Sequence, residues 1–294
     1  MKSVTRHAVR ALVVHRKRCI LRHWITVALT FTTAGSFTFA QSGNRCSGLP
    51  TQAQLRAALS QATDTEASGL NMNMWGSVVD RDGIVCAVAF TGMARGSQWP
   101  GSRVISAQKA NTANAFSLDP TAVSGANGGP LALSTANLYS AVQPGGSLFG
   151  LQDSNPVNTV AAYKGSPTDY GTAKDPLVGE RIGGINIFGG GLALYNANHE
   201  LVGGLGVSGD TSCADHMIAW RTRHNLNLDH LGLTPTVIPG PASLFNGDAS
   251  HPDNIIFDIS PNLNGGTGVS PSGFGHPTCF NQTTDPRLLP QVQQ

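Results

Sequence analysis

Apolar residues recur at helical spacing in three segments of the chain. The first begins at Thr51, where Gln54 completes a capping-box pattern, and is predicted to end near Gly69. The second begins at Ser102, a candidate N-cap, and ends near residue 116. The third follows the Ser208–Asp210 segment and ends near residue 225. The sequence therefore predicts three helices separated by long stretches of other structure.

Apolar runs rich in valine, isoleucine and alanine predict strands between these helices. They span residues 72–79, 84–90, 182–188, 191–195 and 201–207. Asp82-Gly83, between the first two runs, is typical of a tight hairpin. Strands joined by hairpins are antiparallel, so we expect an α+β fold. In it, helices flank an antiparallel sheet and pack on one side of it.

Two segments lack a sustained hydrophobic period. Residues from about 121 to 180 are rich in Gly, Pro, Ser and Asn but contain recurring aromatic residues, and we interpret them as a long ordered insertion. Residues 225–294 have a similar composition with one short apolar run, which indicates an irregular C-terminal extension. The domain itself is predicted to span residues 41–224.

The first forty residues differ from the rest in charge. They hold seven cations and no acid, and an uncharged, largely apolar run from Trp24 to Ala40 follows the basic part. This order predicts a signal peptide over residues 1–40, cleaved before Gln41, with an uncleaved N-terminal anchor as the alternative. We expect a periplasmic or secreted protein with no membrane span after removal of the signal peptide.

The composition of the remainder excludes several classes of protein. Residues 41–294 hold the other 12 cations and all 17 acids, so this part carries a net charge of −5. A mildly acidic body without a basic run argues against nucleic-acid binding. With 40% apolar and 12% charged residues, the chain resembles neither a disordered protein nor a coiled coil.

The cysteines are consistent with export. Cys46, Cys86, Cys213 and Cys279 follow the predicted signal peptide. An even number in an exported chain predicts two disulfides, and four cysteines allow three pairings. We favour pairings in which the terminal residues, Cys46 and Cys279, join the domain at Cys86 and Cys213. No C-x-x-C pair is present, and we expect no metal site.

A glycine-rich motif precedes the last predicted helix. Gly204-Leu-Gly-Val-Ser-Gly209 matches the G-x-G-x-x-G pattern, but the polar segment after the helix cannot be the second strand of a dinucleotide fold. A glycine-rich turn at a helix start still presents backbone N–H groups to an anion. The alternative is simple capping of that helix by Ser208 or Asp210.

Side chains that could carry chemistry are few. No serine–histidine–acid motif and no H-E-x-x-H motif is present. Lys109 is the only lysine between residues 41 and 163, and it is either a pocket group or a solvated helix residue. Cys213 and His216 lie three apart, but two ligands do not define a metal site, so a disulfide beside a surface histidine is the favoured interpretation.

Four motifs in order resemble the GlcG/HbpS family, a DUF336-like group of haem-binding and haem-degrading-type domains. They are Val78-Val-Asp-Arg-Asp-Gly83, Lys109-Ala-Asn-Thr-Ala113, Gly183-Gly184 and Gly203-Gly-Leu-Gly-Val-Ser-Gly209. The resemblance covers residues 55–223, interrupted by the insertion. It implies a profilin-like domain that forms homo-oligomers and, in some members, binds haem. Here the first helix has no histidine, so an axial ligand at that place is not carried over.

The resemblance and the motifs together define a candidate site for haem or another small anionic ligand. Its predicted residues are Arg95, Lys109, Thr112, Ser208, Gly209, Asp210 and His216. The pocket is expected between the helix that carries Lys109 and the start of the helix near Thr211. Whether the protein is an enzyme stays open. The alternatives to haem handling are an enzyme acting on a small organic acid and a non-catalytic sensor or assembly module.

Overall fold

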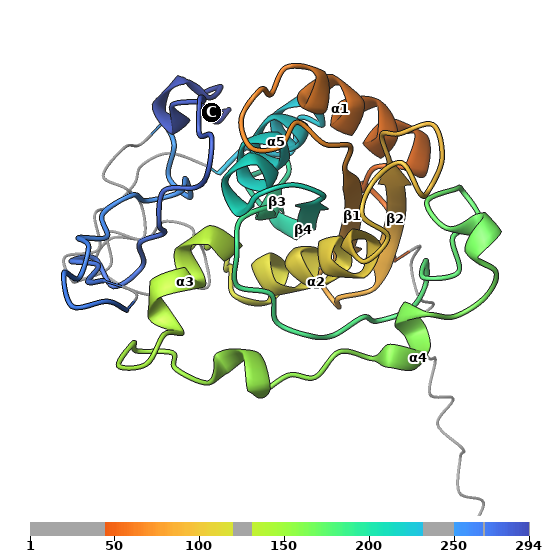
Figure 1. The fold of residues 1–294 in the computed structure, drawn as a ribbon. Helices are drawn as coiled ribbons and strands as arrows, with labels where there is room; N and C mark the ends of the chain where they lie inside the picture. The colour runs from red at the N-terminus through yellow and green to blue at the C-terminus, as the bar shows by residue number, and fades with distance from the viewer. Residues whose placement is uncertain (1–44, 120–130, 232–249, 267, 294) are drawn as a thin grey trace, which may run out of the picture. The chain divides into compact units, whose positions relative to one another are not determined.

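A four-stranded antiparallel sheet organises the part of the chain that the computed structural model describes, namely residues 45–119, 131–231, 250–266 and 268–293 (Figure 1). The strands are β1 (Trp75–Asp80), β2 (Val85–Phe90), β3 (Gly191–Tyr195) and β4 (Leu201–Ser208). Their order is β2-β1-β4-β3, and every neighbouring pair is antiparallel. The predicted α+β class with an antiparallel sheet is confirmed.

Helices cover both faces of this sheet, so the expectation of helices on one side is wrong. The long helices are α1 (Gln52–Asp64), α2 (Ser102–Ala115) and α5 (Ser212–Asn225). Helix α2 lies on one face, whereas α1 and α5 pack together on the other (Figure 1). The short helices α3 (Leu138–Ala141) and α4 (Thr159–Ala162) belong to the predicted insertion.

The ends of the long helices follow local hydrogen bonding. Thr51 and Gln54 form the predicted capping box at α1. Ser102 is the first residue of α2 rather than its cap, because Gly101 occupies the N-cap position without a side-chain bond. Helix α5 is capped by Thr211, whose hydroxyl accepts the N–H of Ala214, so neither Ser208 nor Asp210 is the cap.

The hairpin between β1 and β2 has the turn chemistry that its sequence predicts. The Asp80 carboxylate accepts the N–H groups of Asp82 and Ile84 at 2.9 and 2.8 Å. Gly83 closes the turn with a φ of 75°, a conformation that favours glycine.

The predicted strand over residues 182–188 is absent from the sheet. Gly183 and Gly184 have φ angles of 61° and 77°, and two consecutive left-handed residues turn the chain away from an extended path. Asn186 then donates its N–H to the Thr112 hydroxyl of α2 instead of to a strand. Ile182 belongs to the same buried cluster as Ala107 and Ala110 of α2, and the ring of Phe188 lies beside Lys109 of that helix.

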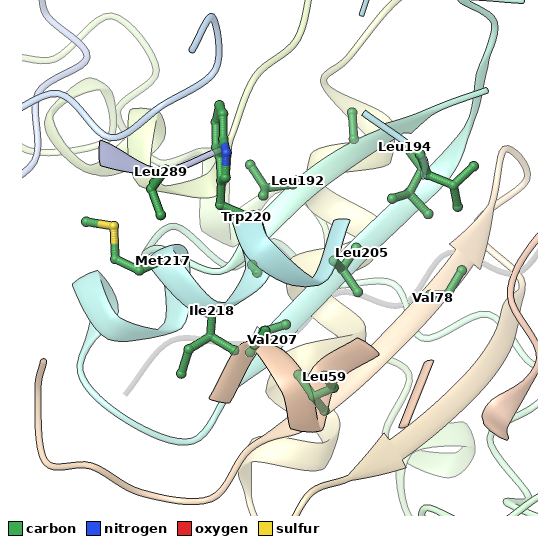
Figure 2. Close-up of a cluster of buried hydrophobic side chains, with 14 of the residues drawn as sticks. Leu59, Val78, Leu192, Leu194, Leu205, Val207, Met217, Ile218, Trp220 and Leu289 are labelled. Atoms are coloured by element: carbon green, nitrogen blue, oxygen red, sulfur yellow. The ribbon is translucent and has the colours of Figure 1, made fainter. Parts of the chain in front are cut away.

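The larger core lies between the sheet and the pair α1–α5. Figure 2 shows its side chains, with Leu59 of α1 facing Val78, Leu205 and Val207 of the sheet. The C-terminal segment completes this core, because Leu289 packs beside α5 and the indole N–H of Trp220 donates to the carbonyl of Pro290 at 2.8 Å. A smaller cluster on the α2 face includes Ala107 and Ala110 of that helix, together with residues of the insertion.

Glycines of β4 allow α2 to approach the sheet closely. A Cβ atom added at Gly206 would overlap the carbonyl oxygen of Ser106 and lie 2.5 Å from the amide nitrogen of Ala110. A Cβ at Gly204 would overlap the carbonyl oxygen of Ala110. The glycine motif therefore serves the contact of helix with strand, where only a hydrogen atom fits between the two backbones.

Two disulfides join the outer segments to the domain. Cys46 pairs with Cys86 on β2, and Cys213 at the start of α5 pairs with Cys279 of the C-terminal segment. This is one of the two pairings that the sequence analysis favoured. The disulfides link residues 40 and 66 positions apart. By reducing the conformational entropy of the unfolded chain, each is expected to stabilise the folded state by about 4 kcal/mol.

The described residues all belong to one unit, Ser42–Gln294, which includes the insertion and the C-terminal segment. No helix among them is long and apolar enough to cross a membrane. The predicted signal peptide, residues 1–40, and its cleavage before Gln41 lie outside the described residues. The domain boundaries at residues 41 and 224 stay predictions.

The Gly206→Ala variant is expected to lower the free energy of unfolding by about 1–3 kcal/mol, because the new methyl group pushes α2 away from β4. Urea denaturation of the wild type and the variant measures this difference. Gly96→Ala is the matched control, since a Cβ at Gly96 meets no atom within 4 Å. Equal losses at the two positions would show that the close approach is unimportant.

Candidate functional site

The seven residues predicted to bind a ligand fall into two groups, and the larger one is buried. Lys109 of α2 has no exposed surface, and its ammonium group lies 2.7 Å from the Asp215 carboxylate of α5. It also donates to the carbonyl of Val207 at 3.1 Å and lies 4.0 Å from the ring centroid of Phe188. The space expected to be a pocket is therefore filled by this ion pair and by the segment that contains Phe188.

Burial governs the electrostatics of this pair. It lowers the pKa of Lys109, although the Asp215 carboxylate acts in the opposite direction. Burial also raises the pKa of Asp215 to about 6, against the stabilising charge of Lys109. The 2.7 Å contact between the two groups connects α2 to α5. Asp215 was missed by the sequence analysis, because nothing local marks an acid in the first turn of a helix as the partner of a distant lysine.

The other residues near this pair bond to the protein itself. The Asp210 carboxylate accepts the N–H groups of Leu70 and Met72 and so holds the segment before β1. Thr112 donates its hydroxyl to the carbonyl of Gln108, one turn earlier in α2. Ser208 and Gly209 are buried at the end of β4, where a Cβ at Gly209 would overlap the carbonyl oxygen of Asn73. Ligand contact by these residues stays a prediction.

His216 lies inside the domain rather than on the surface. It has no exposed area, and its Nε2 accepts the N–H of Ile255 at 3.2 Å. Its Nδ1 has no hydrogen-bond partner among the described residues. Burial lowers the pKa of His216 to about 4, so the imidazole is neutral at physiological pH.

Arg95, the seventh predicted residue, lies apart from the others at a cavity of about 370 Å³. The cavity is lined by Arg95, Trp75, Arg103, Val104, Tyr163 and Tyr170, together with residues of the turn before α2. We call it the Arg95 pocket. Arg95 and Tyr163 are exposed, whereas Trp75 and Arg103 are buried. The pocket thus combines a solvent-accessible guanidinium with aromatic walls, which suits a planar anionic ligand.

An ion pair between α2 and the insertion builds one wall of this pocket. Arg103 donates through Nε to the Asp175 carboxylate at 2.9 Å and through a second nitrogen to the same group. It also donates to the carbonyl of Ala162 at 2.8 Å. Its guanidinium lies over the ring of Tyr170, 3.6 Å from the centroid. These contacts place Tyr170 at the cavity and secure the insertion against α2.

Trp75 contributes an unsatisfied hydrogen-bond donor. The side chain is 1% exposed, and its Nε1 has no partner among the described residues. A buried N–H without a partner costs about 1–3 kcal/mol. The sequence analysis assigned Trp75 to a strand and missed its place at a pocket, because the facing wall comes from an insertion that has no recognisable pattern.

Comparison with known proteins identifies the family of this chain. The sequence model of the family described as "Haem degrading protein HbpS-like" matches residues 51–222, more than half of the chain. The chain belongs to the HbpS-like family. The resemblance noted in the sequence is thereby confirmed. No curated protein matches the chain significantly.

Solved structures include several that are similar to this HbpS-like chain. One is the Klebsiella pneumoniae protein ORFY of the DUF336 group, with 26% identity over 60% of this chain and 90% of that one, and a TM-score of 0.39. Another is a PduOC–haem complex, with 23% identity, coverage of 60% and 91%, and a TM-score of 0.39. A third is a double mutant of Streptomyces reticuli HbpS, with 16% identity, coverage of 68% and 97%, and a TM-score of 0.35.

Acid is expected to destabilise the protein partly through His216. Its pKa is about 4 in the folded state against 6.5 in the unfolded state, so the unfolded chain binds more protons between these values. Stability therefore falls as pH is lowered from 6.5 towards 4. From pH 7 to pH 5 we expect this residue to contribute a loss of about 1–2 kcal/mol. Urea denaturation at both pH values, compared with His216→Gln, isolates the contribution. An equal pH dependence in the variant would contradict it.

Proposed function

We propose that this HbpS-like protein binds haem or a related planar anion in the Arg95 pocket. The observation that carries the proposal is a cavity of about 370 Å³ that is lined by the exposed guanidinium of Arg95 and by aromatic side chains. An anionic ligand would pair with Arg95, while its planar part would pack on aromatic rings.

The side chains of the pocket are suited to haem. Propionate groups would pair with the guanidinium of Arg95, and the macrocycle would pack against the ring of Tyr170. Phenol oxygens can ligate haem iron, and the pocket is lined by two tyrosines. Tyr170 already donates its hydroxyl to the carbonyl of Lys164, so Tyr163 is the available iron ligand. Bound haem would supply iron-centred redox chemistry at this place.

Size decides how much of a macrocycle the pocket holds. At about 370 Å³ the cavity is near the lower end of the range for small-molecule sites. Haem would therefore be buried along one edge, with the remainder outside. Of the seven predicted residues, we assign ligand contact to Arg95. We propose that the other six residues stabilise the domain instead of touching the ligand: Lys109, Thr112, Ser208, Gly209, Asp210 and His216.

The same volume favours a second candidate function, an enzyme acting on a small aromatic or organic acid. Such a ligand would fit entirely inside the pocket and pair with Arg95. The two functions differ in their products, because an enzyme converts its acid whereas a haem-binding protein returns its ligand unchanged. Turnover of small acids that is lost in Arg95→Ala would favour the enzyme.

We also propose that the protein is exported and forms homo-oligomers, with the insertion and the C-terminal segment as contact surfaces. The basic and then apolar N-terminus and the two disulfides support export. Mass spectrometry of the protein from its native host is expected to find Gln41 as the first residue. Retention of residues 2–30 would contradict cleavage. Light scattering determines whether the purified chain is an oligomer.

Hemin added to the purified protein is expected to give a shifted Soret band that saturates at one equivalent per chain. In Arg95→Ala the dissociation constant is expected to rise about 5- to 30-fold, because a charge-assisted hydrogen bond worth about 1–2 kcal/mol is lost. In Tyr163→Phe the position of the Soret band is expected to change, because the phenolate leaves the iron. Absorption titrations measure both effects.

The matched control is Arg45→Ala, which removes an exposed arginine that does not line the pocket. Its affinity for hemin is expected to equal that of the wild type. If Arg95→Ala and Arg45→Ala bind equally well, hemin binds elsewhere and the Arg95 pocket is not its site. If hemin produces no Soret shift at all, the haem proposal is wrong.

A further inference from the structure

A second group of chemically active side chains lies on the opposite side of the sheet from α2, where the C-terminal segment meets α5. Cys213, His276 and Cys279 each offer a ligand atom, and these three atoms lie within 4.8 Å of one another. Among the described residues this is the only such group of three. Cys213 and Cys279 are joined as a disulfide, so in the oxidised protein the group cannot hold a metal ion.

We propose that this group is a reduction-gated zinc site. When a thiol reductant opens the Cys213–Cys279 disulfide, two thiolates and one imidazole nitrogen become available to a single Zn²⁺ ion. Two sulfurs and one nitrogen are ligands that zinc prefers, and a water molecule would complete the tetrahedron. The proposal concerns a site and a ligand separate from the Arg95 pocket.

The surroundings of the two sulfurs favour their thiolate forms. Cys213 is the second residue of α5, and the positive end of a helix dipole stabilises a thiolate there. The N–H of Cys213 points at the sulfur of Cys279, 3.1 Å away. A hydrogen bond to the charged form lowers the cost of deprotonating that thiol. After reduction both sulfurs would therefore be prepared to bind a cation.

His276 is held in place by both ring nitrogens. Nδ1 lies 2.7 Å from the carbonyl oxygen of Pro277, and Nε2 lies 2.7 Å from the hydroxyl of Ser212. A carbonyl oxygen only accepts, so Nδ1 carries the proton and Ser212 donates to Nε2. Metal binding would exchange one of these bonds for zinc and retain the other. Metal-bound histidines are commonly oriented by such a second bond.

The sequence spacing supports the same arrangement. His276 and Cys279 are three residues apart in the C-terminal segment, while Cys213 comes from α5. The other disulfide, Cys46–Cys86, has no histidine or acid placed in this way among the described residues. Gating by reduction is thus a property of one disulfide. The sequence analysis expected no metal site because the chain has no C-x-x-C pair, so it did not predict the proposed group.

The chemistry balances with a dithiol as the reductant. The dithiol supplies two electrons and two protons, is oxidised to its own disulfide, and leaves two protein thiols. Zinc then displaces two protons from these thiols to solvent while His276 stays neutral. In either state the C-terminal segment remains tied to α5, first by the sulfur–sulfur bond and then by the metal.

The test uses the full chain, oxidised or reduced with a phosphine, and Co²⁺ as a spectroscopic substitute for Zn²⁺. The reduced protein is expected to bind one Co²⁺ per chain, with thiolate-to-cobalt absorption that Zn²⁺ abolishes. The oxidised protein is expected to show none. In the reduced His276→Ala variant, Co²⁺ affinity is expected to fall by more than tenfold, since even an outer-shell partner is worth about 10- to 100-fold.

Two controls keep the outcome interpretable. His199→Asn replaces a histidine outside the group at a φ of 64°, which asparagine tolerates, and it should bind Co²⁺ like the wild type. Circular dichroism of oxidised His276→Ala, in which the disulfide is intact, shows whether the variant folds. Cys46→Ser/Cys86→Ser removes the other disulfide and should retain the cobalt spectrum. Absence of thiolate-to-cobalt absorption after reduction, or equal Co²⁺ affinity in His276→Ala, would overturn the proposal.

Discussion

Contact between two backbones determines how this domain is built. Helix α2 rests on β4 where glycines leave no side chain between them, so the helix lies lower on the sheet than ordinary side-chain packing allows. Because its helix lies so close, Lys109 reaches both the carbonyl of Val207 on β4 and the carboxylate of Asp215. The same approach places Arg103, two turns earlier, at the insertion. The buried ion pairs of both regions thus depend on the glycines of one strand.

Features of local origin could be predicted from the sequence. The capping box at Thr51 and the hairpin at Gly83 depend on residues a few positions apart, and both are present. The three long helices and every predicted strand except residues 182–188 are present as well. The glycine motif was recognised, but its purpose was not. A glycine that admits a ligand and a glycine that admits a helix look identical in sequence, and only the position of Ser106 decides between them.

Features of long-range origin could not be predicted. Lys109 and Asp215 are 106 positions apart, and Arg103 and Asp175 are 72 apart. No periodicity joins such residues, so the sequence indicated neither the partner of Lys109 nor the contact of the insertion with α2. The candidate site was therefore only partly predictable. Arg95 was among the predicted site residues, whereas the aromatic walls come largely from a segment without a pattern.

Stability and the walls of the cavity come from different segments of the chain, and this separation bears on how the protein could evolve. The sheet, α2 and the glycines provide stability, while Tyr163 and Tyr170 of the insertion form walls of the cavity. Arg103 holds the insertion through the backbone carbonyl of Ala162 and the carboxylate of Asp175, and neither bond involves the side chain of Tyr163. Relatives could exchange these aromatic residues and acquire different ligands without altering the scaffold. Binding preference would then diverge faster than the fold.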